Sequence, residues 1–524
     1  MRAMIAVSAA LLAGCSMNPP LTKPAMPVPS AYHGATGPAA GAVPDGGVGG
    51  VGGGVAGAVP DGGGGAAGAA GAVPGGGGSV AGAVSGGGGS AAGAVSGGGG
   101  GAPGGVVGEV MPDWRRMLAD PALQRLVELA LENNRDLREA ALNVAAVQAQ
   151  YQIQDAVRLP ALDAVGGATR QRVSSIDAAN GAVTQQTNAG LAINAFELDF
   201  FGRLRSQSEA AFARYLASVE GQRTARLSLI AGVADAYLEL RLAEEQAALT
   251  DRTLADWRLA LSLTERLHGA QQRSGLDVAQ AAGQVATAEA DMHARDRALR
   301  LARNNLELLL GAPVPQDLPT GHPLAHQPVM TTLPAGLPSE LLTRRPDIMQ
   351  AEHALVAANA EIGVARAAFF PRLSLTAQLG FSSAEMGSLF KGSNRSWSFA
   401  PQITQPIFHG GQLRAELKLA EVRNNIAVVQ YERTIQTAFR EVNDALASNE
   451  TYQRQIIAQQ RVVDAAALRE RLSNLRYGAG QDSRLELLDA QRQAYAAQSS
   501  LLDLRRDHFK SAIALYKALG GGVS

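Results

Sequence analysis

The sequence predicts a mainly α-helical protein that also carries a membrane β-barrel and assembles from several chains. Three observations predict this class. The folded region contains two copies of one pattern, each copy has a very long helical stretch, and the segments between helices alternate apolar and polar residues. The formal net charge of -1 gives no reason to expect nucleic acid as a partner.

The first fifteen residues, MRAMIAVSAALLAGC, are typical of a bacterial secretory signal. One Arg precedes a short apolar run, and small residues stand before Cys15, the single cysteine. This resembles a lipobox, so we expect residues 1–14 to be a lipoprotein signal peptide. Residues 15–33 are then the lipidated N-terminal segment, with a covalent lipid on Cys15 and no other cofactor. The alternative is a free cysteine in an ordinary signal peptide. Ser16, by resemblance to enterobacterial lipoproteins, favours the outer membrane.

Residues 34–108 form a tract of Gly, Ala, Val, Pro and Ser in which AGAV recurs five times. Such a segment buries too little apolar surface to offset its conformational entropy, so it is predicted to be a linker. Two interpretations remain open. The tract could tether the lipid to the folded body, or it could be a tolerated repeat expansion without a role, which we favour.

The folded region is an internal duplication. Ser274 and Ser483 are 209 residues apart, as are Asp277 and Glu486. The first copy covers 109–312 and the second 334–520, with a Pro-rich connector at 313–333. A period this long is not that of a solenoid repeat, so each copy is half a protein.

Each copy predicts long helices. Residues 412–477 contain neither Gly nor Pro, and as one helix these 66 residues would span about 99 Å. Ordinary globular helices are much shorter, so helical assembly is expected. The remaining predicted helices are 203–267, 276–310, 484–519, 121–157 and 339–369.

Between the helices the period changes from 3.6 to 2. Residues 373–381 and 397–404 alternate apolar with polar side chains, and a loop containing Gly387, Gly392 and Asn394 joins them. The first copy has weaker counterparts at 162–169 and 191–200, separated by a polar loop. A hairpin on a soluble sheet is one interpretation. For a secreted lipoprotein, strands with one apolar face also describe a membrane β-barrel.

Four strands cannot close a barrel, and lipid does not tolerate open sheet edges. Cyclic assembly is the usual solution. Three copies would supply 12 strands, and the same symmetry would gather their long helices into one cylinder.

Several motifs together resemble the TolC family of outer-membrane efflux proteins, in its lipoprotein branch. They are RPDI at 345–348, FFPRLSL at 369–375, QPIFHGGQLR at 405–414, RLHGAQQRSGLDVAQA at 266–281 and RYGAGQDSRLELLDAQ at 476–491. The resemblance implies a homotrimer with a 12-strand barrel in the outer membrane and a 12-helix α-barrel across the periplasm. It also implies a passive exit duct for small molecules. Its expected partners are a periplasmic adaptor and an inner-membrane pump of the resistance-nodulation-division type.

The two tip motifs are expected to reverse the chain at the periplasmic end. Gly269, Gly478 and Gly480 would break the helices, while Ser274 and Ser483 would cap the returning ones. These residues are fully explained as turns. The resemblance adds that the tips dock the adaptor and close the pore.

The helix after the second tip carries Glu486 and Asp489, three residues apart on one face. The resemblance implies acidic rings that narrow a closed entrance and attract cations, with mutual repulsion raising some pKa values. The alternative is two solvated acids.

A latch is also implied. Tyr477 corresponds to a tyrosine that latches the closed state, but Asp482 stands where the family has a partner arginine. Arg476 or Arg484 could substitute, and Asp277 could accept a hydrogen bond across the tip.

Other classes are weaker. The eight histidines are scattered, and His322 and His326 lie in the Pro-rich connector, so neither a metal site nor an enzyme is expected. A coiled-coil surface lipoprotein would explain the helices but not the duplicated order. An outer-membrane duct for type I protein secretion would keep the fold and change the cargo.

Overall fold

The computed structural model describes residues 17–21, 24, 27–28, 113–172, 183–332, 343 and 345–522. Cys15 and the tract at 34–108 lie outside the described residues, so the lipid and the linker stay predictions. The described elements belong to one compact unit.

The element order repeats, as the duplication predicts. The first copy contains α2 (Trp114–Met117), α3 (Pro121–Asn133), α4 (Arg135–Ala156), β1 (Asp163–Arg172), β2 (Val183–Leu198), α5 (Arg203–Gly269) and α6 (Gly275–Leu310). The second contains α7 (Pro346–Ala367), β3 (Arg372–Ser383), β4 (Arg395–Thr404), α8 (Gln412–Gly478) and α9 (Arg484–Ala518). Short 3-10 helices lie in the connector (η1, Leu324–His326) and in the β3–β4 loop (η3, Met386–Ser388; η4, Gly392–Asn394).

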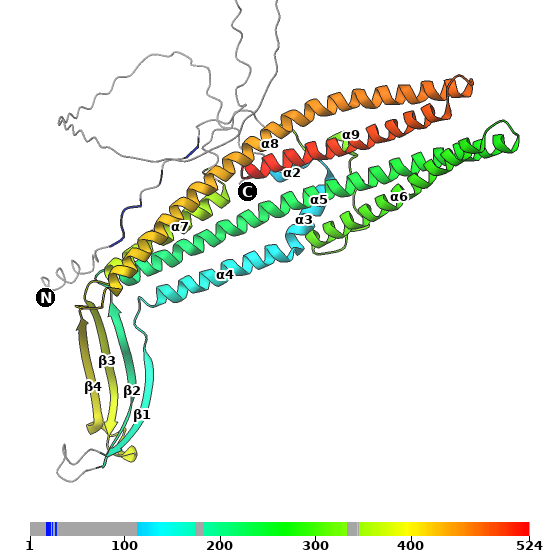
Figure 1. The fold of residues 1–524 in the computed structure, drawn as a ribbon. Helices are drawn as coiled ribbons and strands as arrows, with labels where there is room; N and C mark the ends of the chain where they lie inside the picture. Colours follow the sequence, from blue (N-terminus) through cyan, green and yellow to red (C-terminus); the bar gives the residue numbers. More distant parts are fainter. Residues whose placement is uncertain are drawn as a thin grey trace, which may run out of the picture. The chain divides into compact units, whose positions relative to one another are not determined.

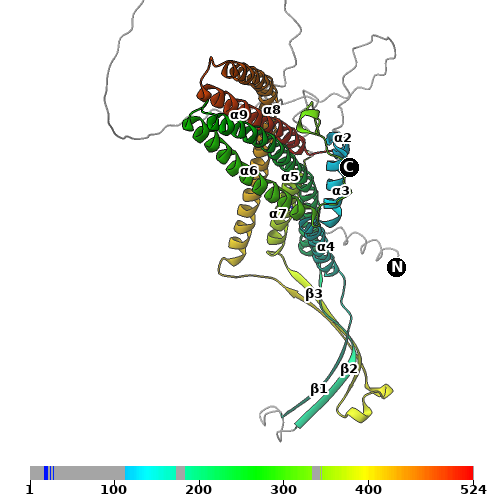
Figure 2. The ribbon, with the colours of Figure 1, turned by 90° about the vertical axis from the view of Figure 1, so that its right-hand side faces the viewer.

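The two copies lie side by side and point the same way (Figure 1). The helix pairs α5–α6 and α8–α9 end in turns at one end, and the four strands lie at the other end in both views (Figures 1 and 2). Nearer the sheet, α4 packs on α5, α5 on α7, and α7 on α8. No described helix is both long and apolar enough to span a membrane.

The strands form one antiparallel sheet in the order β1-β2-β3-β4. Leu379 pairs with Leu191 on one side and with Trp397 on the other. On this apolar face Leu379 is 66% exposed and Trp397 77% exposed. The opposite face is polar, with pairs such as Gln378 and Ser398. The predicted separation into two faces is confirmed.

The first hairpin is longer than predicted. β2 begins at Val183, eight residues before the expected 191, because polar residues assigned to the loop pair with β1 and β3. A β-bulge between Ile193 and Phe196 inserts one residue, and Ala195 there has φ 50. The bulge returns Phe196 to the apolar face, opposite Leu375, so the alternation survives.

The predicted helix 121–157 is wrong at one point, because Asn134 interrupts it. Its side chain accepts a hydrogen bond from the Leu137 amide at 2.8 Å and caps α4. Its Nδ2 also donates to the Leu309 carbonyl, near the end of α6, at 2.9 Å.

The second copy uses the equivalent device. Arg345, the N-cap of α7, is buried, and its Nη1 donates to the carbonyl of Ala518 at 2.6 Å. Ala518 ends α9 and lies 209 residues after Leu309, so both long hairpins are fastened at equivalent carbonyls. Helix α7 therefore starts at Pro346 rather than at 339, because Arg345 is extended and Pro favours the first helical turn.

The main hydrophobic core lies where the two copies meet. Its members include Leu126 on α3, Leu238 on α5, Ile435 on α8 and Ile513 on α9, and each of these is at most 3% exposed. This core anchors the helix pairs, whose turns project away from it (Figure 1).

The start of the chain also contacts this unit. Ser206 donates to Asn18 at 2.8 Å, Asn18 donates to Glu209, and Asn359 donates to the Pro19 carbonyl at 3.0 Å. Val28 packs on the main core. Asn18 and Pro19 thus lie against α5 and α7.

Candidate functional site

The two turns at the free ends of the helix pairs share one backbone geometry. In the second, the Gln481 amide donates to the Arg476 carbonyl at 2.9 Å, and the Gly480 amide to the Tyr477 carbonyl at 3.1 Å. These are the two hydrogen bonds of a Schellman motif, with Gly480 at φ 73 in the left-handed position. The first turn has the equivalent hydrogen bonds, 209 residues earlier.

The left-handed residue of the first turn is Gln271, with φ 59. Gly269 and Gly478 are the last residues of their helices and do not make the reversal. Both helices thus end at the expected glycines, but the left-handed residues that reverse the chain are Gln271 and Gly480. Gln271 was missed because glutamine carries no signal for a positive φ.

The serines cap the returning helices as predicted. Ser274 accepts a hydrogen bond from the Asp277 amide at 3.2 Å, and Ser483 from the Glu486 amide at 3.3 Å. In the first turn the Asp277 carboxylate also accepts hydrogen bonds from the Ser274 amide and hydroxyl, which completes a capping box and lowers the pKa of Asp277. Asp277 thus bonds within its own turn, and the suggested bond across the tip is not the one observed.

Glu486, the counterpart of Asp277, does not bond to its own N-cap serine through its carboxylate but pairs with an arginine on α8. Arg469 Nη2 lies 2.7 Å from Glu486 Oε1 and 3.0 Å from Asp489 Oδ2. The two carboxylates do share a helix face, but one guanidinium joins them (Asp489 also pairs with Arg492 at 3.2 Å). The hydrogen bonds to Glu486 raise the pKa of Arg469, so its guanidinium group stays protonated.

Two arginines lie over the ring of Tyr477. The guanidinium carbon of Arg273, from the first tip, is 4.4 Å from the ring centroid, and that of Arg484 is 5.4 Å away. Arg476 instead forms a two-point ion pair with Asp482, at 2.8 and 2.9 Å. Of the two suggested substitutes, Arg484 contacts the tyrosine and Arg476 does not.

The two tips therefore meet through charge and aromatic contacts. The sequence motifs predicted Tyr477, Glu486 and Asp489 at the tips of the helix pairs. They did not predict the roles of Arg469 and Arg273. Arg469 is seventeen residues before Glu486 on the opposite arm of the hairpin, and no local spacing rule connects two such positions.

A second connection between the helix pairs lies further from the tips. The Tyr495 hydroxyl on α9 donates to Asp291 on α6 and lies 2.8 Å from Thr250 Oγ1 on α5. Burial raises the pKa of Tyr495, and the hydrogen bond to Asp291 adds to this. These residues line a cavity of about 730 Å³ between the helix pairs. Separation of the two tips would have to break this polar contact.

Within the described residues, no cluster of His, Cys, Asp and Glu could hold a metal ion. The backbone amide of His322 donates to buried Asp120 at 2.7 Å, an interaction that holds the connector against α3.

Comparisons with known proteins agree with this geometry. The family model described as "Outer membrane efflux protein" matches residues 126–312 and 337–521. The solvent efflux pump outer membrane protein SrpC of Pseudomonas putida is 46% identical over 420 residues, which cover 80% of this chain and 89% of SrpC. Outer membrane protein OprJ of Pseudomonas aeruginosa is 43% identical over 412 residues, covering 78% of this chain and 86% of OprJ.

A solved structure supports the same relation. The open state of the Neisseria gonorrhoeae MtrE outer membrane channel superposes with a TM-score of 0.74 at 40% identity. The superposition covers 81% of this chain and 94% of MtrE.

Proposed function

The chain belongs to the family of outer membrane efflux proteins, and from this premise we propose that three copies of it form one exit duct through the outer membrane. The protein is an outer-membrane component of an efflux system, a transport channel and not an enzyme. Its narrower properties, which are the trimer, the gate, the partners and the lipid, are argued below from the described residues.

The edge strands and the exposed apolar face of the sheet are the observations that support a trimer. β1 and β4 are the edge strands of the described sheet, and each would leave a row of backbone donors and acceptors unpaired. The apolar face is exposed at Leu379, Trp397 and Phe399. Pairing β4 of one copy with β1 of the next closes twelve strands, satisfies both edges and turns the apolar face toward lipid.

The tips form the gate of this duct. In a trimer, three sets of Glu486, Asp489 and Arg469 meet around the axis, and the contacts of Tyr477 hold the two tips of each copy together. Opening requires the tips to separate, and binding of a periplasmic adaptor to their exposed outer surfaces supplies the free energy for that change. An inner-membrane pump of the resistance-nodulation-division type supplies the driving force.

Small molecules are the cargo that this proposal favours. Relatives of similar length have names that include solvent and toluene efflux pumps. A type I protein secretion duct remains an outcome that identification of the adaptor would reveal.

A lipid on Cys15 anchors the chain. Asn18, three residues later, is held by Ser206 in the first turn of α5, directly after the strand that leads from the sheet. Residues this close to the sheet lie at the membrane boundary of the proposed barrel, which is where an acyl chain must enter. A mass measurement on the mature N-terminal peptide tests this, with Cys15→Ala as the unmodified control.

The proposal is tested by reconstitution. The purified protein should have the mass of a trimer by native mass spectrometry and should form ion-conducting pores in planar bilayers. A folded monomer that never conducts would contradict it.

A further inference from the structure

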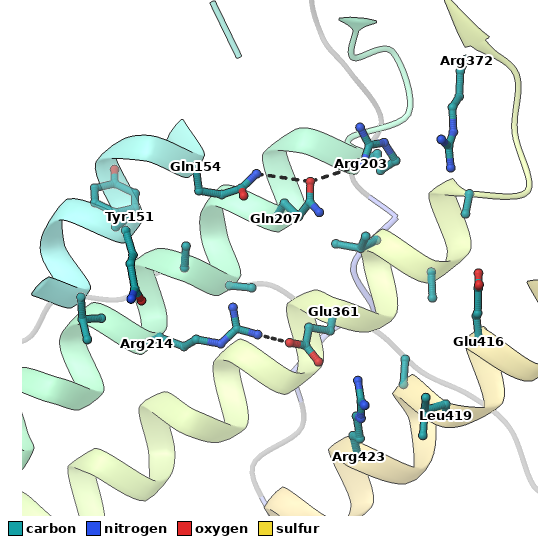
Figure 3. Close-up of a pocket in the computed structure, with 18 residues that line it drawn as sticks. Tyr151, Gln154, Arg203, Gln207, Arg214, Glu361, Arg372, Glu416, Leu419 and Arg423 are labelled. Atoms are coloured by element: carbon teal, nitrogen blue, oxygen red, sulfur yellow. Dashed lines mark hydrogen bonds and ion pairs between the residues drawn. The ribbon is translucent and has the colours of Figure 1, made fainter. Parts of the chain in front are cut away.

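A groove lies where the helices meet the sheet, at the opposite end from the tips. It has a volume of about 550 Å³ and is lined by α4, α5, α7, the start of β3, and α8. Four arginines line it, namely Arg203, Arg214, Arg372 and Arg423, together with two glutamates, Glu361 and Glu416. Figure 3 shows them converging from four of these elements.

Two of the arginines are neutralised within the chain. Arg214 pairs with Glu361, and Arg203 pairs with Glu197 at 2.6 Å (Figure 3 shows the first pair). Among the described residues, Arg372 and Arg423 have neither an ion pair nor a hydrogen bond to their side chains. Glu416, the groove carboxylate on α8, accepts a hydrogen bond from Gln412 at 2.8 Å, and Glu421, two residues before Arg423, pairs with Lys418 at 3.7 Å. The groove therefore keeps an excess of positive charge.

On α7 the groove lies away from the contacts made by Asn18 and Pro19. Asn18 and Pro19 contact Ser206 and Asn359, whereas the groove is lined by Gln207 and Glu361. At about 100° per residue, Glu361 lies about 160° around α7 from Asn359, so Pro19 and the groove lie on opposite faces of this helix.

The position of Arg372 in β3 shows which face of the sheet the groove adjoins. Arg372 alternates with Leu373, so it shares the polar face with Ser374 and Gln378. The groove thus continues the polar face, which lines the interior of the proposed barrel, and it lies opposite the face that meets lipid.

We propose that this basic groove binds small anions that carry phosphate or carboxylate groups as they pass along the duct. Guanidinium groups bind both classes through paired hydrogen bonds, and Arg372 and Arg423 are available for them. Three grooves would form a ring inside the trimer. Its position inside the duct rests on the proposed assembly. The ring would favour anions at the exit, whereas the acidic residues of the tips favour cations at the entrance.

The test uses the intact trimer in nanodiscs of phosphatidylcholine, titrated calorimetrically with tripolyphosphate at low salt. The double variant Arg372→Gln, Arg423→Gln should bind roughly tenfold more weakly or not at all, since each charge-assisted contact contributes on the order of a factor of three or more. The control Arg300→Gln, Arg440→Gln removes the same charge from exposed positions on α6 and α8 and should bind like the parent.

A charge-conserving variant and a change of lipid complete the test. Arg372→Lys, Arg423→Lys keeps the charge but loses the paired hydrogen bonds, so its affinity should lie between those of the parent and the double Gln variant, and an unchanged trimer mass in each variant excludes loss of folding as the cause. Nanodiscs containing phosphatidylglycerol should leave tripolyphosphate binding unchanged; if the anionic lipid abolishes it, a lipid headgroup occupies the groove and the assignment to a transported solute is overturned.

Absence of binding by the parent, or equal binding by the double Gln variant, would also overturn the proposal. The trimer mass and the pore conductance are measured on the same preparations. They test the proposed function separately, so a conducting trimer without anion binding would contradict only the groove.

Discussion

At the scale of single residues, Arg469 decides the charge of the second tip. A ring of six carboxylates without counter-charges would repel strongly, but each Glu486 and Asp489 shares one guanidinium. The tip is therefore a mixed-charge cluster, less acidic than its carboxylates alone suggest.

Removing Arg469 should make the closed entrance bind cations more strongly. We expect Arg469→Ala to lower the concentration of a trivalent cation that half-blocks the pore from the tip side by about fivefold, because Glu486 and Asp489 lose the guanidinium group that they share. Single-channel recording measures this. Arg471→Ala, an exposed neighbour on the same helix, should leave the block unchanged, and an equal effect of both variants would show that only net charge matters.

Tyr477 acts through the face of its ring. Because Arg273 and Arg484 lie over the ring, Tyr477→Phe should keep the closed state, whereas Tyr477→Ala should raise the conductance of the closed pore. Planar-bilayer recording distinguishes them. If the Phe variant leaks as much as the Ala variant, the hydroxyl group holds the latch and the ring does not.

Asp235 on α5 makes stability depend on pH. Burial raises its pKa to about 6, and its Oδ1 is buried without a hydrogen bond, although Lys510 and Lys517 partly oppose the shift. The folded protein thus holds this proton more tightly than the unfolded chain does. The group favours folding most at low pH, and this advantage is lost as the pH rises through about 6.

Asp235→Asn should consequently raise the free energy of unfolding near neutral pH by up to about 3 kcal/mol and by much less near pH 4. Denaturant unfolding at both pH values measures the difference. The duplication supplies the control: Asp444, the equivalent residue, is 73% exposed at its side chain, and Asp444→Asn should show no such dependence. A gain for Asp235→Asn that is independent of pH would contradict this account.

At the scale of elements, the long helices and the two-faced strands could be predicted because they follow from hydrophobic period alone. The break at Asn134 could not be, since it depends on a carbonyl of Leu309 far away in sequence. The extension of β2 was missed because its polar residues resemble a loop until β1 and β3 provide partners. At the tips, the sequence motifs predicted the serine caps, whereas the contacts of Arg469 and Arg273 depend on the fold, which brings residues of different hairpin arms together.

The turns give a matched test of backbone strain. Gln271 holds a left-handed conformation that glycine adopts freely, so Gln271→Gly should stabilise the first tip by about 1 kcal/mol. Gly480→Ala should destabilise the second tip by a similar amount, whereas Gly478→Ala, at a helical position, should not. Hydrogen–deuterium exchange of the tip amides measures each change, and equal exchange in the two alanine variants would contradict the assigned roles.

At the scale of the whole molecule, the chain contacts the folded unit on both sides of the glycine tract. Asn18 and Val28 contact it before the tract, and Trp114 lies in the same core after it. The tract therefore connects two segments that are already attached, and a tether between lipid and body is not required.

Deleting residues 41–105 should thus leave protein level, trimer formation and drug resistance unchanged. Immunoblotting and susceptibility assays in a strain lacking the native gene measure these properties. Lost resistance at a normal protein level would show that the tract has a function of its own.

In the proposed function, the tips receive a periplasmic adaptor of an efflux pump. We would place a photoreactive residue at exposed Gln481, cross-link intact cells and identify the captured protein by mass spectrometry, with Lys418 near the sheet as the control position. Capture of an adaptor of a resistance-nodulation-division pump from Gln481, and not from Lys418, is the predicted result. Capture of a protein-secretion adaptor would contradict the proposed cargo, and no capture from a folded trimer in the outer membrane would contradict the account itself.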